Sequence, residues 1–241
     1  MTLSSADSQT TPRYTWTEIW TAVLTRPSVQ TFQEILSDPA VSRRRAYAWM
    51  LATWAINALF IGLLRAGAAN DAMSAMPNSG RVSPVATQGV LLTSALCAMP
   101  IALVMGFIGF RITVGLVKFA ARTLGGELNY ASAFPGEKAI NSDFAGDKNE
   151  IGTLLTYSFA AIQAPLNIVT LLFAALPANA ITGTISLAAT LYQIYLMALS
   201  LRAIYGFSMG RALASVVLAF LLFLLGILIM VVVVTLFVTR L

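Results

Sequence analysis

The fold is decided by one stretch, residues 212–238, which reads ALASVVLAFLLFLLGILIMVVVVTLFV. It contains no charged side chain, and it exceeds the roughly 20 apolar residues that a helix needs to cross the ~30 Å hydrocarbon core of a bilayer. Lipid offers no hydrogen-bonding partners, so a spanning segment must satisfy its own backbone, as a helix does. We therefore predict a transmembrane helix over these residues.

Four further uncharged runs of similar length precede this stretch, at residues 46–64, 89–110, 151–175 and 178–201. The composition agrees, since 58% of the chain is hydrophobic, 10% is charged and the mean hydropathy is +0.78. A soluble globule of this size would need far more polar surface. We predict an all-α polytopic membrane protein in which residues 46–241 form a bundle of five transmembrane helices.

The segment before the first span, residues 1–45, carries two short amphipathic patterns. Thr15 and Glu18 have the spacing of a capping box, and apolar residues follow on one helical face. This face consists of Trp16, Ile19, Trp20, Val23 and Leu24; a second face consists of Val29, Phe32, Ile35 and Leu36 and stops at Asp38 and Pro39. Two short helices are expected, lying either in the membrane interface or against the cytoplasmic end of the bundle.

Orientation follows from the positive charges, because Lys and Arg near span ends are retained in the cytoplasm. The chain has 15 Lys and Arg residues against 10 Asp and Glu. With the N-terminus inside, only Arg65, Arg81 and Arg240 lie outside. The cytoplasmic segments then hold Arg13, Arg26, Arg43, Arg44, Arg45, Arg111, Lys118, Arg122, Lys138, Lys148, Arg202 and Arg211. We predict a multi-pass protein of the cytoplasmic (inner) membrane with its C-terminus outside.

Part of this positive charge lies on one helical face. Arg111, Lys118 and Arg122 fall within about 40° of one another if the second span continues as a helix, and Gly125 with Gly126 is expected to stop it. Such a face suits anionic lipid headgroups or an acidic partner protein. The residues proposed for this contact are Arg43, Arg44, Arg45, Arg111, Lys118, Arg122, Arg202 and Arg211.

The residue types that carry most membrane chemistry are missing. The sequence has no histidine and one cysteine, Cys97, which excludes an intrachain disulfide and the commonest haem and metal ligands. None of the five spans contains an ionisable acid or base, which argues against a proton or sodium pump and a voltage sensor. We expect no enzyme activity, no cofactor, no metal and no nucleic-acid binding.

Two features remain open to more than one interpretation. Gln163, Pro165 and Asn167 cluster in the third span, where the proline frees a carbonyl, so they form either a polar point on a transport path or an ordinary packing kink. The polar stretch 135–150 is expected to be a solvated cytoplasmic loop, because its Asp spacing does not fit a calcium loop.

Several short motifs, taken in order, resemble the Yip1 family, specifically its bacterial branch. Before the first span stands Thr25-Arg26-Pro27-Ser28-Val29-Gln30-Thr31-Phe32, and after the second stands Leu124-Gly125-Gly126-Glu127. The third span has Thr156-Tyr157-Ser158-Phe159 with Ala164-Pro165, and the fourth leads through Tyr195-Leu196, Arg202 and Tyr205-Gly206 to Arg211-Ala212. The chain departs from the family at residues 135–150, where a polar segment intervenes like an insertion.

The resemblance implies a five-span bundle with a cytoplasmic N-terminus, and the eukaryotic relatives act in vesicle trafficking and bind Rab GTPases and membrane proteins. We therefore expect a non-enzymatic membrane scaffold or adaptor that binds other membrane proteins or itself, with anionic lipids at its cytoplasmic face. Two alternatives stay open. One is a lipid or small-solute translocator that uses the kinked third span. The other is an accessory subunit of an energy-transducing complex without cofactors of its own.

Overall fold

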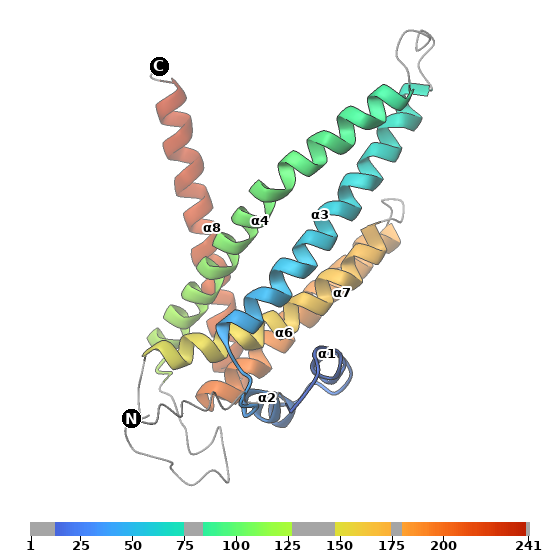
Figure 1. The fold of residues 1–241 in the computed structure, drawn as a ribbon. Helices are drawn as coiled ribbons and strands as arrows, with labels where there is room; N and C mark the ends of the chain where they lie inside the picture. Colours follow the sequence, from blue (N-terminus) through green and yellow to red (C-terminus); the bar gives the residue numbers. More distant parts are fainter. Residues whose placement is uncertain (1–12, 75–83, 127–147, 175–179, 240–241) are drawn as a thin grey trace, which may run out of the picture.

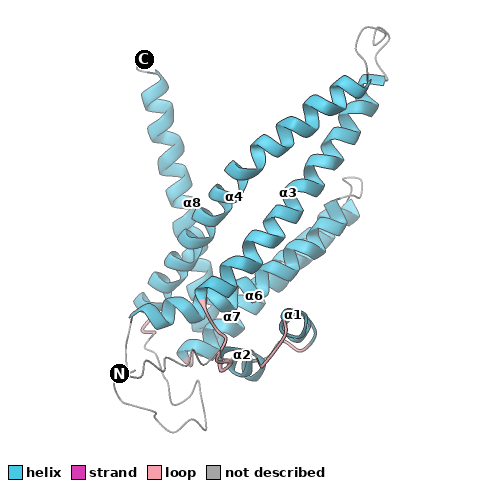
Figure 2. Ribbon diagram, in the orientation of Figure 1, coloured by secondary structure: helices cyan, strands magenta, loops and turns pink. Residues whose placement is uncertain are grey.

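The structure, a computed structural model, describes residues 13–74, 84–126, 148–174 and 180–239. Within these ranges it is all-helical, without strands (Figure 2). The helices are α1 (Trp16–Thr25), α2 (Val29–Leu36), α3 (Arg43–Ser74), α4 (Pro84–Thr123), α6 (Lys148–Ala174), α7 (Ala180–Tyr205) and α8 (Met209–Thr239). The predicted loop 135–150 lies largely outside the described residues.

Five of these helices are long and apolar enough to cross a membrane, which confirms the predicted polytopic all-α fold. They are α3, α4, α6, α7 and α8. Helix α4 runs without interruption through Arg122 and ends at Thr123, so the second predicted span does continue as a helix. Gly125, at φ 79°, takes the left-handed conformation that closes a helix C-terminus.

Local sequence explains the two short helices. Thr15 caps α1 by accepting from the Glu18 N–H, while the Glu18 carboxylate accepts from the Thr15 N–H at 2.7 Å, which is the predicted capping box. Ser28 caps α2 by accepting from the Thr31 N–H at 3.0 Å. Both helices bury their apolar faces against the bundle, α1 on α6 and α2 on α6 and α7. Of the two locations expected for them, the structure shows the packed one.

Helix α6 is the centre of the bundle, because it contacts α3, α4 and α7 as well as the two short helices. The core consists of α6 side chains such as Tyr157, Phe159 and Ile162, together with the neighbouring ends of the other spans. Figure 1 shows that α1 and α2 lie beneath this packed end and form a cap, which we call the α1–α2 cap. Chain direction brings the start of α3, the end of α4 and the starts of α6 and α8 to this same end.

The other end of the molecule is open. Helices α3 and α4 run side by side away from the cap, and α8 diverges from them on the opposite side (Figure 1). Every residue of α8 from 224 to 239 is exposed. The buried residues of α8, Ala212, Ser215, Val216 and Ala219, all lie in its first three turns. The molecule thus has one closed end, and at the other end the outer part of α8, residues 224–239, is exposed.

Candidate functional site

The best-defined polar feature is the joint between the α1–α2 cap and α3. Its centre is Asp38, which follows α2 and is 2% exposed. The carboxylate accepts from the backbone N–H groups of Arg13 (3.3 Å), Tyr14 (3.2 Å) and Ala40 (2.8 Å). These donors come from both sides of the cap, so one carboxylate fixes where the chain enters α1 and where it leaves α2.

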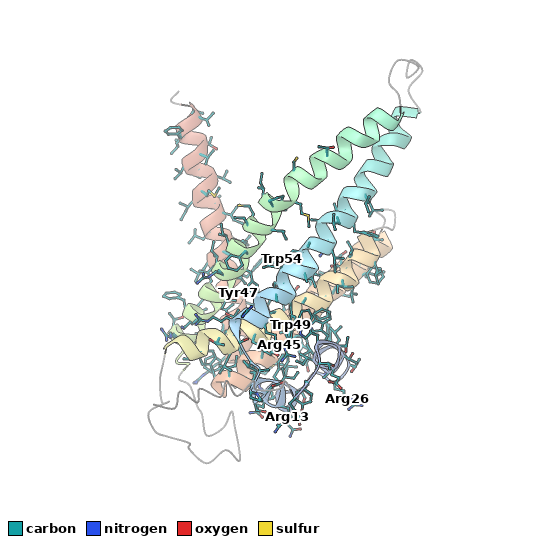
Figure 3. All side chains as sticks on the ribbon, viewed as in Figure 1. Arg13, Arg26, Arg45, Tyr47, Trp49 and Trp54 are labelled. Atoms are coloured by element: carbon teal, nitrogen blue, oxygen red, sulfur yellow. The ribbon has the colours of Figure 1, made fainter. Side chains whose placement is uncertain are left out.

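Arg45 completes this joint from the first turn of α3. Its Nη1 lies 3.7 Å from the Asp38 carboxylate, and its Nη2 donates to the Tyr14 carbonyl at 2.7 Å. A buried carboxylate needs such a partner, because desolvating an unpaired charge costs several kcal/mol. Arg45 therefore ties the start of α1 to α3, and Figure 3 shows Arg45 and Trp49 where α3 meets the cap.

An aromatic cluster surrounds the arginine. The guanidinium lies 5.4 Å from the centre of the Trp49 ring and 6.0 Å from that of Tyr157 on α6. Trp49 in turn contacts Tyr157 at 4.8 Å and the cap residues Trp16 and Trp20 at 5.8 and 6.2 Å between ring centroids. The cap is therefore held by ring contacts and cation–π contacts as well as by hydrogen bonds.

A separate hydrogen bond fixes the far end of α1. The Tyr192 hydroxyl on α7 donates to the carbonyl of Leu24 at 2.6 Å. Leu24 lies in the last turn of α1, where carbonyls have no partner within the helix. The cap is thus fastened at its start by Asp38 and Arg45 and at this carbonyl by Tyr192.

A groove of about 500 Å³ opens along the outer side of the cap. Its lining combines hydroxyls and carboxylates with apolar surface. Its lining includes Tyr14, Thr17, Glu18, Thr21, Arg26 and Glu34.

The structure divides the eight basic residues proposed for lipid or partner contact. Arg45 is internal, with its side chain 12% exposed, so it is unsuited to binding a headgroup. Arg44, Arg122 and Arg211 are exposed near the cap end, and Arg43 and Lys118 are half-buried there. Arg202 donates from Nε to the Phe207 carbonyl at 3.2 Å. Arg111 is exposed but about 18 Å from the end of α4, given 1.5 Å per helical residue, and it lies 5.9 Å from the Phe107 ring.

Gln163, Pro165 and Asn167 lie on α6, which continues as a helix through the proline. Pro165 is buried, while the two amides are half-buried. The groove described above does not reach them. Among the described residues, no three His, Cys, Asp or Glu side chains gather as metal ligands would.

Sequence reasoning missed the joint itself. Asp38 looked like a helix stop and Arg45 like one of three equivalent arginines, and the partners that distinguish them are 24 to 31 residues away along the chain. A usable signal existed, since an acid directly after an apolar helical face and next to three arginines indicates a pairing.

The comparisons with known proteins agree with the architecture. The family model described as Yip1 domain matches residues 21–232, which include the second half of the cap-forming α1, all of α2 and most of α8. No curated protein and no solved structure matches the chain significantly. The Yip1 family is not a known enzyme family. With a match over most of its length, this chain belongs to the Yip1 family.

Proposed function

We propose that this multi-pass membrane protein is a non-enzymatic scaffold or adaptor that binds other membrane proteins or further copies of itself. The observation that carries the proposal is the outer part of α8, residues 224–239, in which every residue is exposed. A partner helix can associate there through van der Waals packing, as helices do in lipid.

The closed end and the outer part of α8 are suited to different tasks in a scaffold. The cap is fixed by hydrogen bonds, an ion pair and ring contacts, so it holds the spans together. The outer part of α8 stays exposed and can contact a partner helix. The exposed basic residues Arg44, Arg122 and Arg211 lie at this end. By the positive-inside rule we propose that it faces the cytoplasm and anionic headgroups, which places the C-terminus outside the cytoplasmic membrane.

Site-directed crosslinking in native membranes tests the scaffold role. Cys97 is replaced by Ala, and a cysteine at Leu228 carries a photo-activatable crosslinker. We expect crosslinked proteins of defined mass, resolved by gel and identified by mass spectrometry. A cysteine at Ser215, which is buried, is the matched control on the same helix and is expected to yield only crosslinks within the chain. Crosslinks to lipid alone at Leu228, together with a monomer in mild detergent, would overturn the proposal.

The translocator alternative makes a different demand. The purified protein would then carry lipid or solute across the bilayer of liposomes, and Gln163→Leu or Asn167→Leu would abolish that transport. We expect no such activity from a scaffold. Flux that depends on either amide would replace the scaffold proposal with the translocator.

A further inference from the structure

Two basic side chains from different helices meet over a glycine of α6. Gly152 is buried near the start of α6. The point at which a Cβ would stand on it lies 2.8 Å from Arg43 Nη2 and 3.6 Å from Lys118 Nζ. Arg43 is the first residue of α3, and Lys118 belongs to the last turns of α4. Three spans therefore bring a guanidinium and an ammonium to one place.

Both side chains carry a positive charge, so an anion placed between them would be attracted by both. Each side chain also takes part in a contact within the chain, so an added anion would join or compete with that contact. A phosphate group suits the pair well, because guanidinium presents a planar set of donors and ammonium adds three more.

The position of the pair indicates where such a phosphate comes from. It lies where α3 begins and α4 approaches its end, which is the depth of lipid headgroups if these helices span the bilayer. The same stretch of α4 exposes Ile112 and Phe119, which offer apolar surface to acyl chains. Free phosphate would have no use for that apolar surface.

We propose that Arg43 and Lys118, brought together over Gly152, form a binding site for the phosphate of an anionic phospholipid. The inference deepens the headgroup contact in the proposed function, but it does not depend on a partner protein. Gly152 is part of the site because a methyl group there would occupy the place of the Arg43 guanidinium. The exposed cations elsewhere at this end act only through their general field.

Lipid retention by the purified full-length protein tests the site. The protein is exchanged into detergent containing equal amounts of phosphatidylglycerol and phosphatidylcholine, and native mass spectrometry counts the bound lipids. Arg43→Gln and Lys118→Gln are each expected to reduce retained phosphatidylglycerol about fivefold, the ratio that corresponds to roughly 1 kcal/mol per basic residue. Arg26→Gln removes an exposed charge from the cap, outside the basic residues proposed for headgroup contact, and is the control, expected to change retention by less than about twofold.

Gly152→Ala separates the site from general charge. It keeps every charge and displaces only the flexible end of Arg43, since no atom other than those of Arg43 and Lys118 is closer than 3.7 Å. We expect retention to fall with no drop in melting temperature, because Ala favours a helix over Gly. Gly115→Ala, on α4 with open space around it, is the control and is expected to retain lipid normally.

Three outcomes would overturn the inference. One is an equal loss of lipid in Arg26→Gln and Arg43→Gln, which would indicate a diffuse effect of positive charge. Another is normal retention in Gly152→Ala together with both glutamine variants. The third is displacement of phosphatidylglycerol by millimolar inorganic phosphate with equal retention of both lipids, which would indicate a free-phosphate site. None of these outcomes depends on whether the outer part of α8 crosslinks to partners, so the scaffold proposal is tested separately.

Discussion

Helices α6 and α8 are both membrane spans, yet they are used in opposite ways. Of the 18 most apolar consecutive residues of α6, 72% are buried inside the protein, whereas the corresponding figure for α8 is 11%. The buried helix is the more polar of the two, with Thr156, Tyr157, Ser158 and Gln163 among its residues, while α8 is almost entirely aliphatic. Within this chain the polar groups lie where spans contact one another, because neighbouring helices supply hydrogen-bonding partners that acyl chains lack, whereas the aliphatic span is left open to lipid or to the helix of a partner.

A matched pair of phenylalanines gives this comparison its largest expected effect. Phe159 on α6 is fully buried, and Phe220 on α8 is 60% exposed. Phe159→Ala leaves a cavity and is expected to lower the free energy of unfolding by about 3 kcal/mol or more, whereas Phe220→Ala is expected to change it by less than about 1 kcal/mol. Unfolding in mixed micelles titrated with sodium dodecyl sulfate measures both. Equal losses would mean that the outer face of α8 is packed after all.

The joint between the α1–α2 cap and α3 has no counterpart on the outer part of α8. Removing its carboxylate should lower the stability nearly as much as Phe159→Ala does. Asp38→Ala leaves three backbone N–H groups without their acceptor and Arg45 without its ion-pair partner. We expect a loss of about 3 kcal/mol in unfolding free energy, measured in the same titration, since breaking a buried pair leaves an uncompensated charge. Glu34→Ala removes an exposed carboxylate from the cap and should be nearly silent.

The contrast between the two helices also explains what sequence reasoning could reach. The five spans were predictable because the bilayer imposes a length and an apolar composition that can be read segment by segment. The capping box at Thr15 and Glu18 and the glycine stop at Gly125 were predictable because their partners are at most five residues apart. All of these are local signals.

The rest of the candidate site depends on contacts between distant segments. The amphipathic face of α1 was equally consistent with lipid contact, and its ring contacts with Trp49 on α3 could not be predicted from the segment alone. On α4, Ile112 and Phe119 are exposed, whereas Val114 and Val117 make the buried contacts. Hydropathy does not reveal which apolar side of a span meets protein, because lipid accepts every apolar side equally.

Loosening one fastening of the cap should have a smaller effect than breaking the joint. Tyr192→Phe removes the hydroxyl that donates to the Leu24 carbonyl at 2.6 Å and keeps the ring. We expect a loss of about 1 kcal/mol, the usual net contribution of one hydrogen bond. Faster hydrogen exchange of the amides in the last turn of α1, next to Leu24, reports the loosening directly. Tyr195→Phe, on the exposed side of the same helix, is the control, and equal exchange rates in the two variants would contradict this role for Tyr192.

The smallest effect is expected at the start of α1, far from both spans being compared. The Thr15 N–H and hydroxyl donate to the Glu18 carboxylate and lower its pKa below the usual value, because they stabilise the charged form. A lowered pKa means that this contribution is complete at neutral pH and is lost as the pH falls through that lowered value. Glu18→Gln should therefore weaken amide protection in the first turn of α1, measured by hydrogen exchange. In the unsubstituted protein this protection should fall as the pH is lowered through the pKa of Glu18, and in Glu18→Gln this pH dependence should be absent. Glu34→Gln controls for loss of an exposed carboxylate; if it weakens the same amides equally, the capping box is not what orders the start of α1.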